Sequence, residues 1–390
     1  MMTIPSVEQA LQEADKCVKC GLCMPHCPTY RLYSDENESP RGRIALAEAL
    51  LRGQLDSSEG LVDHLYRCLL CRRCETTCPS GVGYAKLIDA ARAKAPRSHW
   101  ASRVTANNKT ASLLVQVAQK VAIPGSQLSA LSQALPAKAA PKPGRYPARG
   151  ELRGKVNLFL GCATRLYQGA ALHAAITVLT RLGFAVVIPG QQGCCGALAQ
   201  HQGDVQTAGR QIQENQAAFG AGETLVCIAS GCTVQLQETM QPQQEVIDIV
   251  SFLQRILGQY SASLPPLQAK AALHLPCSAV NVLRQGQDMR ALLEQIPGLE
   301  LHTLGQPGDC CGAAGDHLLT QRKQAESLRK PLLEQLLELN PDYLVTSNVG
   351  CALHLAEGAR QRGAQLEVLH PVELLARQLG EGHPAQGAAR

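Results

Sequence analysis

Aromatic residues are scarce in this sequence: they make up 3% of its 390 residues, with one Trp and four Phe. Proteins that bind single-stranded nucleic acids stack the bases on aromatic side chains. The net charge of +5, from 37 basic and 32 acidic residues, is modest for this length. The composition therefore predicts no nucleic-acid partner, and the length suits about two or three domains.

Long apolar runs are absent too. A membrane-spanning helix needs about 18 or more consecutive apolar residues, and the most apolar stretch, residues 111–123, is interrupted by Gln116, Gln119 and Lys120. The N-terminal residues 1–15 are polar and contain acids, unlike a secretory signal. We therefore expect no transmembrane segment and a cytoplasmic, reducing compartment, where thiols stay reduced.

Nucleotide-binding motifs are missing as well. The sequence has no G-x-G-x-x-G after a strand-like run and no Walker phosphate loop. Hydride chemistry is normally carried by a flavin or a nicotinamide. The sequence therefore predicts no flavin or NAD on this chain.

Cysteine, in contrast, is abundant, with 17 residues. Two runs follow the pattern C-x₂-C-x₂-C-x₃-C-P, and their cysteines are Cys17, Cys20, Cys23 and Cys27, then Cys68, Cys71, Cys74 and Cys78. This pattern holds bacterial-type iron–sulfur clusters, and in paired runs the fourth cysteine ligates the other cluster. The sequence predicts two [4Fe–4S] clusters, one on Cys17, Cys20, Cys23 and Cys78 and the other on Cys68, Cys71, Cys74 and Cys27.

Zinc and disulfides are the alternatives for these cysteines. A structural zinc site usually takes two separated pairs of ligands, whereas here a triplet with a trailing Cys-Pro occurs twice. Disulfides suit small secreted scaffolds, which this chain does not resemble. Both alternatives explain the duplicated run less well than two clusters do.

The residues between the two runs have helical patterns. Ser39 and Pro40 are typical of a helix start, apolar residues then recur at helical spacing until Gly53, and a second helix is expected over residues 59–67. Residues 1–96 are therefore expected to form an all-α cluster domain. The segment from Ser39 to Arg43 is either a capped helix start with solvated arginines or a segment that faces a cluster.

Residues 97–154 are interpreted as a connector. A short helix is expected over residues 110–121, and a Pro-rich basic stretch follows over residues 136–149. Such a composition is typical of a semi-rigid linker. An anionic membrane surface could attract its basic residues, but a solvated linker is the simpler interpretation.

Residues 155–380 contain an internal repeat. The corresponding segments are 155–162 and 271–277, 192–196 and 308–312, 224–232 and 343–351, and 245–248 and 367–370. Each half alternates short β-rich apolar runs with helical stretches, which predicts α/β units around a mainly parallel sheet. The expected domains are 155–258 and 270–380, with cysteines after strand ends, where open α/β sheets place their ligands.

Each repeat supplies one cysteine, then a Cys-Cys-Gly, then a further cysteine. The two sets are Cys162, Cys194, Cys195 and Cys232, and Cys277, Cys310, Cys311 and Cys351. Gly196 and Gly312 would let the backbone turn so that both adjacent thiols reach one site. Cys227 is interpreted as a buried small hydrophobe, and His274, His302 and His370 as structural groups.

The Cys-Cys-Gly sets resemble the "CCG" domains of heterodisulfide reductase and its relatives. In that family the last cysteine begins a Cys-x-x-Cys, and five cysteines can hold a non-cubane cluster. Here Gln235 and His354 occupy the final positions. Three alternatives stay open for each set: an additional four-cysteine cluster, a thiol-redox or metal site, since thiolates favour iron–sulfur clusters or zinc, and a vestigial framework.

The order of these parts, together with the His370-Pro-Val-Glu-Leu-Leu stretch, resembles the glycolate oxidase iron–sulfur subunit family over nearly the whole chain. The resemblance implies an α+β multidomain fold: an all-α two-cluster ferredoxin domain followed by two repeated α/β CCG domains. It also implies electron transfer from flavin-binding subunits of a glycolate or D-lactate dehydrogenase complex towards quinone. Such a complex is associated with the inner face of the cell membrane, and the isolated chain is not expected to turn over substrate.

Other functions remain open at this point. Relatives with the same architecture serve lactate, glycerol-3-phosphate or heterodisulfide chemistry. A thiol-disulfide reductase working through the CCG cysteines is a different class of function, and the absence of Cys at positions 235 and 354 argues against it. A third interpretation treats the clusters as scaffold only.

Overall fold

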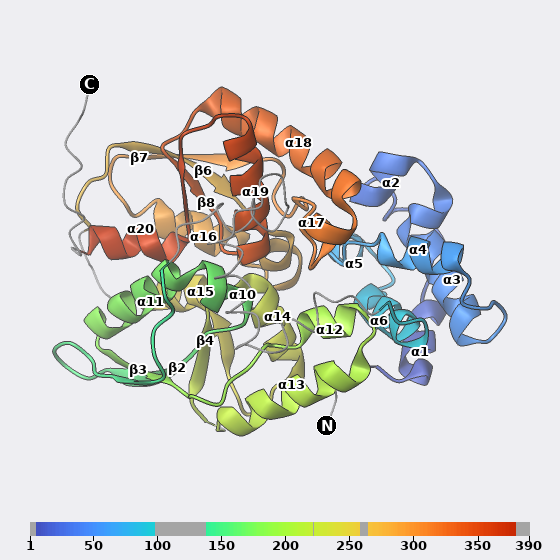
Figure 1. Ribbon diagram of the computed structural model, residues 1–390, viewed down its shortest axis with the longest axis horizontal. Helices are drawn as coiled ribbons and strands as arrows, with labels where there is room; N and C mark the ends of the chain where they lie inside the picture. The colour runs from blue at the N-terminus through green and yellow to red at the C-terminus, as the bar shows by residue number, and fades with distance from the viewer. Residues whose placement is uncertain (1–4, 98–137, 221, 258–263, 380–390) are drawn as a thin grey trace, which may run out of the picture.

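The computed structural model describes residues 5–97, 138–220, 222–257 and 264–379. Within them the chain forms an N-terminal helical domain that lies beside two α/β domains (Figure 1). This is the fold class that the sequence predicts. The helix expected over residues 110–121 lies outside the described residues.

The regular secondary structure of the N-terminal domain, residues 5–97, consists of helices only. Its helices are α1 (Val7–Asp15), α2 (Pro28–Tyr33), the 3₁₀ turn η1 (Glu36–Glu38), α3 (Pro40–Leu51), α4 (Glu59–Tyr66), α5 (Arg73–Thr76) and α6 (Tyr84–Lys94). Serine side chains cap α1, α3 and α4 at Ser6, Ser39 and Ser58, as such residues do at N-termini. The predicted helices after Ser39-Pro40 and from residue 59 are therefore both confirmed.

The first α/β domain is built on a five-stranded sheet with the order β1-β3-β2-β4-β5. Its elements are β1 (Gly144–Tyr146), β2 (Gly154–Phe159), α10 (Ala163–Tyr167), α11 (Gly169–Arg181), β3 (Phe184–Ile188), α12 (Ala197–His201), α13 (Val205–Ala218), β4 (Thr224–Cys227), α14 (Ser230–Thr239), β5 (Val246–Asp248) and α15 (Ile249–Leu257). Strands β2 to β5 are parallel.

The structure differs from the expected linker at its C-terminal end. β1 pairs antiparallel with β3, with Gly144 opposite Ile188. Upstream of β1, Lys138 packs closely against Gly169. A Cβ built on Gly169 would lie 1.9 Å from the Lys138 carbonyl oxygen. Residues 138–154 therefore pack on the first α/β domain, because β1 adds an edge strand to its sheet.

The second α/β domain has four parallel strands in the order β7-β6-β8-β9. Its elements are β6 (Ala269–His274), a π-helical turn η2 (Ser278–Val282), α16 (Gly286–Leu293), β7 (Leu299–Leu304), α17 (His317–Thr320), α18 (Arg322–Leu339), β8 (Tyr343–Val345), α19 (Val349–Gln361), β9 (Glu367–Leu369) and α20 (Pro371–Gln378). This order matches β3-β2-β4-β5 of the first domain, so the predicted repeat is confirmed as a structural repeat.

The two repeats share one hydrophobic core. α11 packs on α20 and α15 packs on α16, and these four helices lie side by side between the two sheets (Figure 1). Leu172 and Leu253 from the first repeat join Leu292 and Leu375 from the second in the same buried cluster. The repeats therefore form one unit rather than two independently packed domains.

Polar contacts also join the repeats near their cysteine sites. The Ser230 and Ser278 hydroxyls lie 2.7 Å apart. His370 Nε2 lies 2.7 Å from the Ile228 carbonyl oxygen, and its Nδ1 accepts a hydrogen bond from the Val372 N–H. The structural interpretation of His370 therefore agrees with its contacts.

The helical domain packs against both repeats. Tyr66 Oη donates to the Gln202 carbonyl (2.8 Å), and Arg92 Nη1 donates to the His201 carbonyl (3.0 Å), both in the first repeat. In the second repeat, Gln324 Nε2 donates to the Arg67 carbonyl at 2.9 Å. These contacts fix the cysteine runs relative to the repeats.

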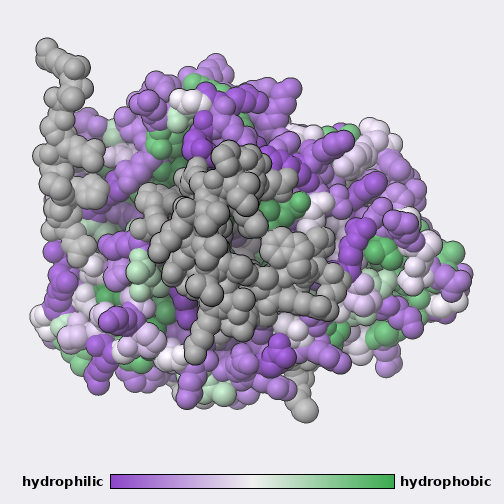
Figure 2. Space-filling model, viewed as in Figure 1, coloured by the Kyte–Doolittle hydropathy of each residue, from purple (hydrophilic) through white to green (hydrophobic). Residues whose placement is uncertain are grey.

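In the part of the chain that the structure describes, no helix is long and apolar enough to cross a membrane. The face shown in Figure 2 is mostly hydrophilic, with small separate apolar patches over the N-terminal helical domain. Val18 (71% exposed) and Leu22 (57% exposed), both in the first cysteine run, are among the most exposed large apolar residues.

Asp248 gives the fold a pH dependence that can be tested. It is fully buried at the end of β5, and burial raises its pKa to about 7, whereas an aspartate in an unfolded chain titrates near about pH 4. Between these values the folded state keeps a proton that the unfolded state has lost. The contribution of Asp248 to stability therefore falls as the pH rises from about 4 to about 7, by about 1.4 kcal/mol per unit, and this dependence ends above the folded pKa.

We expect Asp248→Asn to remove that contribution. In anaerobic urea denaturation between about pH 5 and pH 8, the unfolding free energy of the wild type minus that of the variant should fall as the pH rises to about 7 and then level off. Parallel curves for the two proteins would show that Asp248 does not hold the proton in the folded state.

Candidate metal centres

The first cysteine triplet lines a cavity of about 450 Å³ in the helical domain. Cys17, Cys20, Cys23 and Cys78 line it, and so does Cys74, which also lines the second cavity. Lys19 and Gly21 have positive φ angles of 56° and 85°. These two left-handed residues curl the loop so that three cysteines face one cavity, and Gly21 adopts this conformation without the cost of a Cβ.

The second triplet lines a neighbouring cavity of about 310 Å³. The cysteines around it are Cys27, Cys68, Cys71 and Cys74. Leu70 and Arg72, which correspond to Lys19 and Gly21, have φ angles of 47° and 57°. The two runs therefore share one backbone conformation, and Cys27 and Cys78 each line the cavity of the other run.

The donor chemistry of these cavities fits [4Fe–4S] clusters. None of the 17 cysteines forms a disulfide, and four thiols around one cavity are the ligand set of such a cluster. Burial, followed by the charges of neighbouring thiols, raises the pKa of Cys23 to about 11 and that of Cys74 well above its ordinary value. Because metals bind thiolates, these thiols must release protons on binding.

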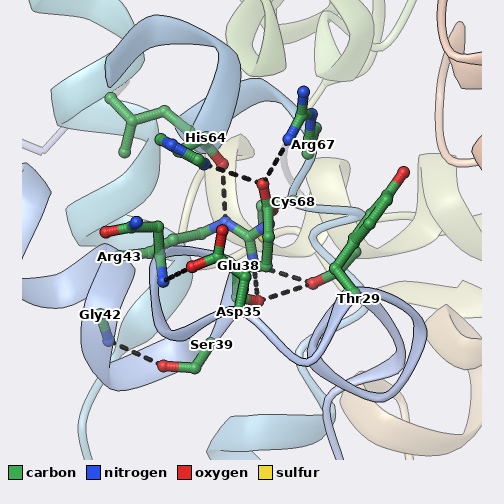
Figure 3. Close-up of polar contacts among 12 residues, drawn as sticks. Thr29, Asp35, Glu38, Ser39, Gly42, Arg43, His64, Arg67 and Cys68 are labelled. Atoms are coloured by element: carbon green, nitrogen blue, oxygen red, sulfur yellow. Dashed lines mark hydrogen bonds and ion pairs between the residues drawn. The ribbon is translucent and has the colours of Figure 1, made fainter. Parts of the chain in front are cut away.

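A buried ion pair supports the second cavity (Figure 3). Arg43 and Glu38 pair directly, and both side chains are essentially inaccessible to solvent. Glu38 also accepts hydrogen bonds from His64 Nδ1 and Arg67 Nη1, each at 2.8 Å. The carboxylate is thus fully bonded, as a buried charge has to be.

The same arginine reaches the cysteine at the end of the first run. Arg43 Nη1 donates to Thr29 Oγ1 (2.9 Å) and to the Glu38 carbonyl (2.6 Å), and Thr29 Oγ1 lies 3.2 Å from Cys27 Sγ. The ion pair therefore positions Cys27 against the second triplet.

The contacts decide between the two interpretations of the segment from Ser39 to Arg43. Ser39 does cap α3, accepting from the Gly42 N–H at 3.0 Å, but Arg43 is buried beside the second cavity. Arg41 lines the first cavity and donates to the Lys19 carbonyl at 3.1 Å. The interpretation as solvated arginines is therefore wrong for Arg43, and the segment faces both cavities.

The sequence pattern does not identify several residues that lie at or near the cavities. Tyr84 lines both cavities and its hydroxyl donates to Cys68 Sγ at 3.5 Å. Arg92 Nη2 donates to the Cys68 carbonyl at 2.7 Å. The spacing of Tyr84 and Arg92 in α6 resembles any amphipathic helix, so their roles emerge only from packing.

In the first repeat, all four cysteines of the set converge. Cys162 Sγ and Cys194 Sγ lie 3.2 Å apart. The hydrogen bond with Cys162 lowers the pKa of Cys194, but the bond with Cys195 and burial outweigh it and raise the pKa to about 12. Cys195 interacts with Cys194 and Cys232. Gly196 has φ +92°, so the turn expected after the adjacent cysteines is present.

The second repeat has the same arrangement. Cys311 Sγ donates to Cys351 Sγ at 3.0 Å, and Cys310 interacts with Cys277. Gly312 also has φ +92°, and a Cβ there would lie 2.5 Å from the Ala325 carbonyl oxygen. Both repeats therefore bring four thiols together at the carboxyl ends of their strands.

The residues that replace the family's last cysteine are bonded elsewhere. Gln235 Nε2 donates to Gln200 Oε1 at 2.8 Å. His354 Nε2 lies 3.1 Å from the Ala325 carbonyl oxygen, and its Nδ1 lies 3.3 Å from Arg329 Nη1. Neither side chain has a nitrogen left over for its cysteine set.

The remaining histidines differ from one another. His302 is partly exposed and lies 2.6 Å from Glu300, and Cys227 is fully buried in the core, as expected. His274, in contrast, is buried with no hydrogen-bond partner on Nε2, and burial lowers its pKa to about 4. Its interpretation as a satisfied structural group is therefore wrong.

The second repeat's site adjoins the second cavity of the helical domain. Asn281, in the π-helical turn η2, donates to the Cys71 carbonyl at 2.9 Å. Arg73 pairs with Asp309, the residue before Cys310. After burial, the charge of Cys277 is the largest influence that raises the pKa of Cys71. Cys71 therefore lies next to the second repeat's thiols.

Gly42 provides a test of the contacts around the cavities. A Cβ at Gly42 would lie 1.9 Å from the Glu36 carbonyl oxygen, whereas Gly60, another helical glycine, has no atom within 4 Å of a built Cβ. We expect Gly42→Ala to displace the segment that carries Glu38 and to lower bound iron. Gly60→Ala should keep its iron and gain up to about 1 kcal/mol from helix propensity.

The measurements are iron per chain after anaerobic purification and the urea midpoint of each variant. Equal iron content and equal midpoints in the two variants would contradict the proposed role of the close approach at Gly42.

Comparison with known families agrees with this geometry. A model described as "4Fe-4S dicluster domain" matches residues 13–82, and one described as "Cysteine-rich domain" matches residues 156–237 and 271–356. These ranges cover the two cavities and the two repeats respectively.

Two individual relatives match most of the chain, and a third matches part of it. The glycolate oxidase iron-sulfur subunit of Escherichia coli (strain K12) is 32% identical over 88% of this chain and 90% of its own length. The probable glycolate oxidase iron-sulfur subunit of Bacillus subtilis (strain 168) is 28% identical over 92% of both. Lactate utilization protein A of Geobacillus thermodenitrificans (strain NG80-2) is 27% identical over 57% of this chain and 98% of its own. The chain therefore belongs to the family of glycolate oxidase iron–sulfur subunits.

Proposed function

We propose that this chain is the electron-transfer subunit of a flavin-dependent 2-hydroxy-acid dehydrogenase, acting on glycolate or D-lactate. The observation that carries the proposal is the pair of adjoining cavities in the helical domain that the eight cysteines of the two runs line. When bound there, two [4Fe–4S] clusters supply one-electron chemistry. Cys17, Cys20, Cys23 and Cys78 would hold one, and Cys27, Cys68, Cys71 and Cys74 the other.

The first cavity is suited to contact with a partner. Cys20 is exposed, and Val18 and Leu22 beside it are the apolar side chains that extend furthest into solvent in this run. An apolar rim around an exposed redox site favours docking of another protein. We propose that the flavin-bearing subunit docks on this loop.

The second cavity lies deeper and faces the second repeat. Cys27 and Cys68 are buried, and Asn281 and Asp309 hold the Cys71 loop against the repeat. The first cavity, the second cavity and the cysteines of the second repeat thus follow one another from the exposed loop around Cys20 towards the second repeat. We propose that at least this repeat's thiols hold a metal or cluster of their own.

The substrate is proposed from the relatives. Two of them are named for glycolate oxidase and another for lactate utilization. We propose that hydride abstraction occurs on the partner, that quinone is the eventual acceptor, and that the complex lies on the inner face of the cell membrane. The isolated chain would then be unable to oxidise a 2-hydroxy acid.

The crossed ligand sets can be tested with matched variants. Cys27→Ala should remove the cluster of Cys68, Cys71 and Cys74, so the iron content should fall by about four per chain. Its reduced-state EPR spectrum should match that of Cys71→Ala. Cys78→Ala should instead match Cys20→Ala. If Cys27→Ala matched Cys20→Ala, the crossed assignment would be wrong.

The function itself is tested by anaerobic stopped-flow absorbance of the complex with the flavoprotein that co-purifies with this chain. Glycolate or D-lactate should reduce the flavin and then the clusters, and Cys71→Ser should stop reduction of a quinone analogue while flavin reduction persists. The chain alone should show no reduction by either substrate. Clusters that stay oxidised through many turnovers of the flavin would overturn the proposal.

A further inference from the structure

The second repeat has a potential metal donor that the sequence pattern did not identify. His274 Nε2 has no hydrogen-bond partner. A ring nitrogen of His274, Cys311 Sγ and Cys351 Sγ lie within 4.8 Å of one another, and all three residues are buried. A buried imidazole with an unpaired nitrogen, grouped with two thiols, is the donor set of a Cys/His metal site.

The strands hold the imidazole in this orientation. His274 is the last residue of β6, and its Nδ1 lies 3.0 Å from Thr346 Oγ1, just after β8. Metal-ligating histidines characteristically use the second ring nitrogen for such a bond, which fixes the ring and leaves the other nitrogen for the metal. Nε2 is therefore the ring nitrogen that is free to bind a metal.

The first repeat provides an internal comparison. Its β2 ends at Phe159, which pairs in register with Cys227 of β4, so the positions of His274 and Thr346 are filled by two apolar residues. Phe159 is buried in the first repeat's core cluster with Cys194 and Cys195. A phenyl ring at this position has no polar atom that needs a hydrogen-bond partner. An imidazole there leaves a buried nitrogen unpaired, which costs free energy unless a ligand binds that nitrogen.

We propose that His274 Nε2 is a metal ligand in the second repeat, together with Cys311 and Cys351, and that the first repeat lacks this ligand. Mixed thiolate and imidazole ligands favour a borderline-soft metal, either zinc or an iron of an iron–sulfur cluster. His274 would add a fifth donor to four thiols, in a repeat where His354 is committed to other hydrogen bonds. This inference rests on the proposed occupancy of the second repeat.

The test compares four forms of the full-length chain, purified anaerobically: wild type, His274→Phe, His274→Cys and Cys311→Ser. His274→Phe copies the first repeat and should be tolerated by the fold. We expect it to lose the metal that Cys311→Ser loses, or to bind it at least about tenfold more weakly in competition with a chelator. His274→Cys, which restores a soft donor, should retain the metal.

Spectroscopy identifies the ligand and separates the two metals. With iron bound, ¹⁵N-labelled histidine should give a nitrogen hyperfine coupling in pulsed EPR that is absent in His274→Phe. With zinc bound, replacement by Co²⁺ should give d–d absorption bands that shift between wild type and His274→Cys. Retained ferredoxin-type EPR signals in every variant would show that the helical domain is intact.

Two results would overturn the inference. Unchanged affinity and unchanged spectra in His274→Phe, with metal still lost in Cys311→Ser, would mean that the site is occupied without His274. Equal metal content in wild type and Cys311→Ser would mean that the second repeat binds none. Neither result bears on reduction of the ferredoxin clusters by substrate, which is measured separately.

Discussion

The buried pair of Glu38 and Arg43 is the interaction on which the cluster domain depends. A buried ion pair stabilises a fold only when its remaining hydrogen-bonding groups are satisfied, and removing one partner costs about 3–5 kcal/mol. Here the carboxylate also accepts from His64 and Arg67, and Arg43 Nε donates to the His64 carbonyl at 2.7 Å. The pair therefore joins η1, α3 and α4, which lie between the two cysteine runs.

That location explains how two runs far apart in sequence come to share two cavities. The crossed arrangement requires the end of the first run to lie against the second triplet, and Arg43 supplies the connection through Thr29 to Cys27. Gly42 allows the chain to approach Glu36 closely enough for this. One short segment thus combines a helix cap, a close backbone approach and a buried cation.

The sequence predicts the parts of this protein whose signals are local. The cysteine runs identify both thiol sets because cluster ligation requires fixed short spacings, and the repeat is visible because Cys162 and Cys277 follow similar apolar runs. The strand β1 was missed because three residues of a Pro-rich stretch pair only through contact with β3. The environments of Arg43 and His274 depend on residues that are distant in sequence, so the sequence does not predict them. Arg43 contacts His64 as well as the nearby Glu38. His274 lies beside Thr346 and Cys351.

The two repeats keep one fold while their surroundings diverge. The first meets the helical domain through a polar chain in which Gln235 binds Gln200, and Gln200 Nε2 donates to Asp89 at 2.9 Å. Both repeats also contact the second cysteine run: Glu238 of the first repeat pairs with Arg72, and Asn281 of the second donates to the Cys71 carbonyl. Cys71 lies near Cys277 and Cys310 of the second repeat. The second repeat is also the one that carries a histidine where the first carries Phe159, so the thiol set that adjoins the second cavity has a buried imidazole beside it.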